Sequence, residues 1–132
     1  TSDADNFPNV SPKEMFTFVQ EDKLLIANIA SPNSIQNIKV NNKVCVSFVD
    51  VFVQKGFKIK GIARIIDEND VDFETKVGII KSLFTDKFPI LQLIEIEAKN
   101  IESIKAPSYL MFPEITEQEQ IESAKQTYNK QL

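Results

Sequence analysis

Small polar residues at the start of a predicted helix are the strongest candidate for chemistry in the sequence. The run Ser31-Pro32-Asn33-Ser34 begins with a residue favoured at the helix N-cap, and proline suits the first helical position. A helix N-terminus offers unpaired N–H groups and a partial positive charge, and these side chains add hydroxyl and amide donors. Such a run is typical of a plain helix cap, and it also suits a phosphate group.

Basic residues elsewhere in the sequence could complete such a site. Lys13 follows a proline at a predicted strand end, and Lys55 stands in a turn beside a glycine, where the backbone can approach a ligand closely. Lys55 opens a short basic run that continues to Lys58, Lys60 and Arg64. This run suits a small anionic ligand better than a nucleic acid duplex, or else it forms a solvated strand face.

The counts of reactive residues exclude most self-contained catalytic centres. The 132 residues include no His, one Cys and three Gly. A Ser-His-Asp triad, a Cys-His pair, a His-based zinc site and a CxxC redox pair are therefore all excluded. We identify no catalytic residue and no metal ligand. We expect the reactive group of any chemistry to be one that the protein binds and not one of its own side chains. The one cysteine, Cys45, lies in an apolar strand and is expected to be buried.

Charge and hydropathy limit the kinds of binding partner and the cellular compartment that we expect for this protein. Fifteen Lys and Arg against nineteen Asp and Glu give a formal net charge of −4, which argues against binding to nucleic acid. No window approaches the roughly 18–20 apolar residues of a membrane span, and no signal peptide is visible, so we expect a cytoplasmic protein without a membrane partner. The chain starts at Thr1 rather than at a methionine, which leaves open whether residues precede it.

Hydrophobic periodicity predicts an α+β fold that is mostly β. Strands are expected at residues 7–11, 15–19, 24–29, 44–53, 57–66 and 90–98. Helices are expected at residues 31–41, 71–84 and about 116–130. The run at 44–53 is almost continuously apolar, which predicts a central strand covered on both faces. About six strands without a strand–helix alternation indicate one domain, residues 1–132, with a mostly antiparallel, barrel-like sheet and peripheral helices.

The C-terminal helix has a thin apolar stripe. Thr116 and Glu119 have the spacing of the capping box that opens this helix. The stripe consists of Ile121, Ala124, Tyr128 and Leu132. Because the stripe is thin, the helix is expected to lie peripherally or to dock on a partner subunit. The preceding stretch between two prolines, residues 107–113, is expected to be irregular.

An ordered set of short motifs resembles the pyridoxamine 5′-phosphate oxidase-like family, the FMN-binding split β-barrels. The motifs follow the family's order from about residue 5 to residue 66. They are residues 7–13 (FPNVSPK), 24–29 (LLIANI), 31–38 (SPNSIQNI), 42–48 (NKVCVSF) and 54–61 (QKGFKIKG). The resemblance implies a six-stranded antiparallel split β-barrel, a homodimer, and one FMN at each of two sites along the dimer interface.

The resemblance also implies which residues hold the cofactor. The segment that would lie against the flavin ring contains Asn9, Ser11, Pro12 and Lys13. The strand-to-helix turn that would contact the ribityl and phosphate groups contains Asn28, Ser31, Asn33 and Ser34. A basic residue of the next hairpin, Lys55 or Lys58, would help to neutralise the phosphate.

Two departures from the family pattern bear on function. Many members carry Arg or Lys near the start of the short helix, where this chain has Asn33 and Ser34, so the positive charge would have to come from Lys13 or Lys55. True pyridoxamine phosphate oxidases hold their substrate with Arg and His residues of a C-terminal segment, whereas this chain has no His and its only Arg is Arg64. We therefore do not expect this chain to oxidise pyridoxamine phosphate.

The leading hypothesis is a dimeric FMN-binding flavoprotein, an oxidoreductase that takes hydride or electrons from a donor and passes them to a small-molecule substrate. The alternative is a split-barrel flavin carrier or regulatory module without turnover. A deazaflavin could take the place of FMN. Haem is disfavoured because the chain has no His to serve as an axial ligand.

Overall fold

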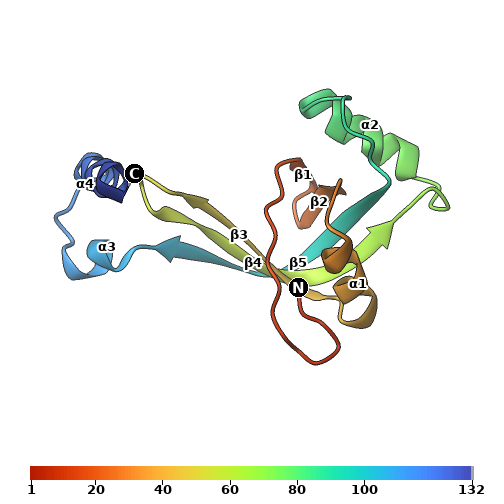
Figure 1. Cartoon of the computed structure of the whole chain (residues 1–132), viewed down its shortest axis with the longest axis horizontal. Coiled ribbons are helices and arrows are strands. Elements are labelled where there is room, and N and C mark those ends of the chain that lie inside the picture. Colours follow the sequence, from red (N-terminus) through yellow and green to blue (C-terminus); the bar gives the residue numbers. More distant parts are fainter. Residues whose placement is uncertain (132) are drawn as a thin grey trace. The chain divides into compact units, whose positions relative to one another are not determined.

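A computed structural model describes residues 1–131, and within them the chain forms five strands and four helices (Figure 1). The strands are β1 (Phe16–Gln20), β2 (Lys23–Asn28), β3 (Lys43–Asp50), β4 (Lys55–Ile66) and β5 (Gln92–Lys105). The helices are α1 (Pro32–Val40), α2 (Phe73–Leu83), α3 (Pro107–Met111) and α4 (Glu117–Gln131). The strands form one antiparallel sheet in the order β1-β2-β5-β4-β3, which confirms a mostly β, α+β fold.

One of the six strands expected from the sequence, at residues 7–11, is not a strand in the described chain. This segment makes one isolated antiparallel bridge, between Ser2 and Pro8. The side chain of Asp3 accepts a hydrogen bond from the backbone N–H of Phe7 (2.9 Å), and Asn6 has a positive φ of 66°. The turn chemistry of residues 3–6 therefore outweighs the β-propensity of the residues that follow.

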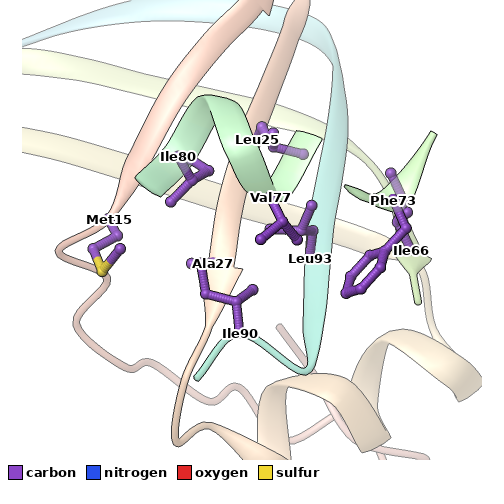
Figure 2. Close-up of a cluster of buried hydrophobic side chains, with 9 residues drawn as sticks. All are labelled: Met15, Leu25, Ala27, Ile66, Phe73, Val77, Ile80, Ile90 and Leu93. Carbon is purple, nitrogen blue, oxygen red and sulfur yellow. The ribbon is translucent and has the colours of Figure 1, made fainter. Parts of the chain in front are cut away.

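The described chain divides into two compact units. The first unit consists of residues 1–45 and 60–100, and the second consists of residues 46–59 together with those from Ile101 onwards. Strands β3, β4 and β5 contribute residues to both units. The main hydrophobic cluster lies in the first unit. It consists of Met15, Leu25, Ala27, Ile66, Phe73, Val77, Ile80, Ile90 and Leu93 (Figure 2).

Helix α2 and strand β2 show why this cluster forms. The cluster residues of α2 repeat at helical spacing, as the sequence predicts, and Figure 2 shows them pointing toward those of β2 and β5. Strand β2 contributes the alternate residues Leu25 and Ala27. The alternating residues Leu24 and Ile26 are also buried. Leu24 pairs across the sheet with Ile96 of β5, and Ile26 pairs with Ile94. Strand β2 is therefore covered on both faces.

A group of ion pairs joins α2 to the sheet beside the hydrophobic cluster. Glu95 of β5 is only 7% exposed, and its carboxylate accepts hydrogen bonds from Lys76 of α2 (2.5 Å) and Arg64 of β4 (3.2 Å). Lys76 also pairs with Asp72 (2.5 Å), and Arg64 pairs with Asp70 (3.0 Å). Burial alone would raise the pKa of Glu95, but the hydrogen bonds from Lys76 and Arg64 bring it below its usual value.

Strand β3 is not the central, covered strand that its apolar sequence predicts. It lies at the edge of the sheet, next to β4, and its side chains at Cys45 and Val49 are exposed. The turn that follows β3 also exposes Val51 and Phe52. The prediction that Cys45 is buried is therefore wrong. An apolar run marks residues that gain from burial, but it does not say how many strands pair beside them.

The second unit contains the two C-terminal helices. The predicted capping box of α4 is confirmed, because the N–H of Glu119 donates to Thr116 Oγ1 (3.2 Å) and the N–H of Thr116 donates to Glu119 Oε2 (2.8 Å). Tyr128 of α4 contacts the β3–β4 turn, where its hydroxyl donates to the carbonyl of Val51 (3.3 Å). Leu132, the last residue of the predicted stripe, lies outside the described residues.

Two further observations concern the helices. The stretch expected to be irregular contains α3, which starts at a proline as α1 does. None of the helices within residues 1–131 combines the length and the apolar character that crossing a lipid bilayer requires.

Candidate functional site

Three serine hydroxyl groups and one lysine ammonium group converge at the start of α1. The Oγ atom of Ser11 lies 3.4 Å from that of Ser31 and 3.3 Å from that of Ser34. Lys13 Nζ donates a hydrogen bond to Ser31 Oγ (2.6 Å) and another to Ser11 Oγ. We call Ser11, Lys13, Ser31 and Ser34 the hydroxyl cluster. Ser34 is buried, whereas the other three are half-buried, so the cluster borders the solvent.

Backbone pairing brings these residues together from two separate segments. The N–H of Ala27 in β2 donates to the carbonyl of Met15 (2.9 Å), which holds the segment that contains Ser11 and Lys13 beside β2. At the end of β2, Asn28 Oδ1 accepts a hydrogen bond from the N–H of Ser31 (3.1 Å). The strand end, the turn and the helix start are thereby tied into one local structure.

The hydroxyl group of Ser31 does not cap α1. Ser31 occupies the N-cap position and Pro32 follows it in the first turn, as the sequence predicts. Its side chain makes no hydrogen bond to the helix, however, and its Oγ atom accepts the hydrogen bond from Lys13 instead. The expected side-chain cap is therefore wrong. Without that cap, the N–H groups of the first turn remain available to an outside acceptor.

The electrostatics of the cluster favour an anion. No carboxylate within residues 1–131 forms an ion pair with Lys13, and the first turn of α1 contains no acidic residue. Burial lowers the pKa of Lys13 below its usual value, because desolvation disfavours the charged ammonium group. The ammonium group also lies at the positive end of the helix dipole. A bound anion would offset both unfavourable effects.

Besides the two hairpin lysines, three of the predicted cofactor-binding residues, Asn9, Pro12 and Asn33, have no hydrogen bond to the cluster within residues 1–131. The side chain of Asn9 donates to Thr1 Oγ1 (3.2 Å), and the backbone N–H of Asn9 donates to the carbonyl of Thr1 (2.8 Å). Pro12 and Asn33 are exposed, the first between Ser11 and Lys13 and the second in the first turn of α1. Their proposed contacts with a flavin stay predictions.

The two predicted lysines of the hairpin are paired with carboxylates of the second unit. Lys55 Nζ lies 2.7 Å from Glu117 Oε1 and 4.4 Å from the centre of the Tyr109 ring. The hydrogen bond to Glu117 raises the pKa of Lys55. Lys58 Nζ lies 2.9 Å from Glu102 Oε2. Within the first unit, the positive charge at the start of α1 therefore comes from Lys13.

Sequence reasoning missed Gln92. Its Oε1 atom accepts a hydrogen bond from Asn28 Nδ2 (3.5 Å), which orients the amide that in turn holds the N–H of Ser31. Gln92 stands directly opposite Asn28 in the pairing of β2 with β5. The available signal is a polar residue at the start of an otherwise apolar strand, but its meaning depends on a register that the sequence does not reveal.

Comparison with known proteins gives one match by sequence and several by structure. Residues 1–105 match the sequence model of the family described as pyridoxamine 5′-phosphate oxidase. No curated protein matches the chain by sequence.

Several solved structures are similar in fold. HupZ of Group A Streptococcus is 20% identical, with a TM-score of 0.69 over 80% of this chain and 82% of that one. An FMN-binding protein from Syntrophomonas wolfei subsp. wolfei is 14% identical, with a TM-score of 0.66 over 80% of this chain and 74% of that one. HutZ, the heme storage protein from Vibrio cholerae, is 19% identical, with a TM-score of 0.62 over 77% of this chain and 80% of that one. At these identities the likeness concerns the fold alone.

Proposed function

The chain belongs to the pyridoxamine 5′-phosphate oxidase family, and from this premise we propose that it binds FMN with the phosphate group at the hydroxyl cluster. The observation that carries this proposal is the uncapped start of α1. There, Ser31 turns its hydroxyl group away from the helix and towards Lys13, a cation without a carboxylate partner in the described chain. Hydroxyl donors, an ammonium group and free N–H groups are the donor set that a phosphate prefers.

The residues of the cluster fit this role by their chemistry. Ser11, Ser31 and Ser34 each carry a hydroxyl group that can donate to a phosphate oxygen. Many family members carry a positive charge near the start of the short helix. This chain has Asn33 and Ser34 there, and Lys13 supplies the positive charge instead. Asn28 and Gln92 act as positioning residues, because Asn28 holds the backbone N–H of Ser31 and Gln92 orients the Asn28 amide.

We propose further that the protein is an oxidoreductase with a small-molecule substrate. FMN, when bound, supplies hydride and electron transfer, which no residue of this histidine-free chain provides. The task left to the chain is to bind the cofactor, orient it and exclude water. The FMN-binding protein from Syntrophomonas wolfei subsp. wolfei, which has a similar fold, supports the choice of cofactor, and a deazaflavin is the second choice.

Pyridoxamine phosphate is not the substrate in this proposal. The chain has no His, and its single arginine, Arg64, is already bound to Glu95 and Asp70. An arginine held by two carboxylates is poorly placed to bind the phosphate of a substrate.

The proposal includes a homodimer built on the family's six-stranded split barrel, of which the five-stranded sheet would form the greater part. Its support is the exposed apolar surface of the second unit, where Val49, Phe57 and Ile101 are each about half exposed. Exposed apolar residues on neighbouring strands are typical of an interface between chains. Sedimentation should give twice the 15.0 kDa of one chain, and a monomer at every concentration would contradict this part of the proposal.

The alternative is a flavin-binding carrier or regulator in the same cytoplasmic setting. Both hypotheses predict flavin binding, so they must be distinguished by stopped-flow measurement of flavin reduction and reoxidation. Fast reduction of the reconstituted protein by NADH or NADPH, followed by reoxidation with an acceptor, would support the enzyme. A flavin that binds but is not reduced by either donor would favour the carrier.

The test of the proposal is the visible spectrum of the protein after reconstitution with FMN and removal of free flavin. A retained flavin spectrum is expected. The same experiment with haem serves as the comparison, because HutZ is a heme storage protein of similar fold. We expect no haem to be retained, since the chain has no His for an axial ligand. Retention of haem without retention of FMN would overturn the proposal.

A further inference from the structure

A second site lies in the first unit and shares no residue with the hydroxyl cluster. It is a cavity of about 420 Å³ whose wall includes Lys43 and Cys45 of β3, Lys60 of β4 and Lys99 of β5. The other strand residues that line it are Val44, Gly61 and Ile62. The volume falls in the range of pockets that hold small molecules.

The cavity is positively charged in a chain of net negative charge. Among the described residues, no Asp or Glu lines it, and neither Lys43 nor Lys60 forms an ion pair with a carboxylate. Lys99 contacts Glu97, which neutralises it locally. Two uncompensated ammonium groups therefore face a cavity of a protein whose formal net charge is −4. Cations gathered at a concave surface raise the local concentration of anions.

The cavity also contains the one thiol of the chain. Cys45 is exposed and stands two residues after Lys43 on β3, so the two side chains point to the same side of the strand. At Gly61 the wall of the cavity has no room for a side chain, because a Cβ atom there would lie 2.5 Å from the carbonyl oxygen of Glu97. A small molecule that enters the cavity meets the thiol and the lysines together.

We propose that this cavity binds anionic low-molecular-weight disulfides and that the bound disulfide exchanges with Cys45. The thiolate of Cys45 attacks one sulfur of the disulfide, whose S–S bond breaks as a new S–S bond forms to Cys45. The other half leaves as a thiolate. The disulfide is the oxidant, and the proton of the Cys45 thiol passes to the buffer or to the leaving thiolate. Lys43 and Lys60 act as counter-ions for the anionic groups of the bound molecule.

The test compares two reagents of different charge on the full chain. The dianionic 5,5′-dithiobis(2-nitrobenzoate) and the uncharged 2,2′-dithiodipyridine both release a coloured thiol when they react with Cys45. Lys43→Gln and Lys60→Gln should each slow the dianionic reagent about threefold, and the double variant should slow it about tenfold at low ionic strength. The uncharged reagent should react with all variants at the rate of the unaltered chain.

Lys87→Gln is the matched control. Lys87 is exposed and does not line the cavity, so this variant changes the net charge equally without touching the site. The proposal is overturned if Lys87→Gln slows the dianionic reagent as much as the double variant does, or if the double variant slows both reagents alike. The uncharged reagent also reports misfolding, because a rearranged β3 would change its rate as well. Neither reagent involves FMN, so the outcome does not depend on flavin binding.

A second readout uses disulfides that resemble cellular thiols. Mass spectrometry should detect more mixed disulfide at Cys45 with glutathione disulfide, which carries carboxylate groups, than with the cationic cystamine. The double variant Lys43→Gln with Lys60→Gln should remove this preference. A preference for cystamine in the unaltered chain would contradict the proposal.

Discussion

Replacing Lys13 with glutamine removes one positive charge from the hydroxyl cluster and keeps a side chain that can donate to Ser31. In the structure, Lys13 Nζ donates to Ser31 Oγ at 2.6 Å. A phosphate oxygen that also accepts from the Ser31 hydroxyl group would lie roughly 4–5 Å from this nitrogen, given ordinary hydrogen-bond lengths. In the proposed binding mode, the substitution should therefore affect the phosphate of FMN and not the flavin ring.

The expected loss of affinity follows from the position of Lys13 at the protein surface. Two unit charges about 4 Å apart interact by about 1 kcal/mol in bulk water and about 4 kcal/mol near a protein surface. Lys13 is half-buried, so we expect a value between these limits, about 2 kcal/mol, for the loss of its interaction with the phosphate. This corresponds to an approximately thirtyfold increase in the Kd for FMN.

The stability of the flavin-free protein should respond differently. The lowered pKa of Lys13 means that folding disfavours its ammonium form. That cost is fully present below the folded-state pKa and is relieved as the pH rises towards the ordinary value of 10.5. At neutral pH, Lys13→Gln should therefore leave the Tm of the flavin-free protein unchanged within about 2 °C, or raise it.

The assay is a fluorescence titration with FMN and with riboflavin, which lacks the phosphate group. Lys13→Gln should weaken FMN binding and leave the weaker riboflavin binding unchanged. An equal loss for both flavins would refute the reasoning, because it would show that Lys13 acts on the ring or on the fold. Unchanged FMN binding would refute it as well.

Three other variants, the last with a matched control variant, test different parts of the structure. Ser31→Ala combined with Ser34→Ala should weaken FMN binding more than tenfold while lowering the free energy of unfolding by less than the roughly 1 kcal/mol of a true cap, as measured by titration and urea unfolding. Glu95→Gln should lower the free energy of unfolding at pH 7 by about 1.5–3 kcal/mol, because the half-buried Lys76 and the exposed Arg64 lose their charged hydrogen-bond acceptor and, among the described residues, keep only Asp72 and Asp70. Since the folded-state pKa of Glu95 is lowered, its contribution is present above the unfolded value near 4.5 and is lost below it, so urea unfolding should show the two proteins converging as the pH falls. Gly61→Ala should destabilise the chain by about 1–3 kcal/mol, because its Cβ would lie 2.7 Å from a side-chain carbon of β5. Gly78→Ala, whose Cβ would meet open space in α2, is its control and should stabilise by up to about 1 kcal/mol.

Short-range signals in the sequence predicted the elements well. A serine followed by a proline marks the start of α1, and a Thr-Glu capping box opens α4. Both depend on residues within four positions of each other, so the sequence contains all of the relevant chemistry. Strand β3 depends instead on its neighbours in the sheet. Its apolar sequence cannot reveal that the order β1-β2-β5-β4-β3 leaves it at the edge, with Cys45 exposed.

The candidate site shows the same division between local and distant information. Ser31 and Ser34 are recognisable from their place at a helix start. That Lys13 reaches them depends on the hydrogen bond between Ala27 and Met15, and so on the pairing of β1 with β2. Gln92 could not be found, because its role follows from the register that sets it opposite the end of β2. The sequence therefore identified the donors at the helix and left the counter-charge open between Lys13 and Lys55, whereas the tertiary structure places Lys13 beside Ser31 and reveals the support from Gln92.

The ratio of the dissociation constants of FMN and riboflavin for the unaltered protein tests the central claim most directly. Both molecules share the isoalloxazine ring and the ribityl chain, so the ratio isolates the phosphate group. A phosphate bound by the hydroxyl cluster should make FMN bind at least thirtyfold more tightly than riboflavin, as the Lys13 interaction alone implies. Equal affinity for the two flavins, or no binding of FMN at micromolar concentration, would contradict the account.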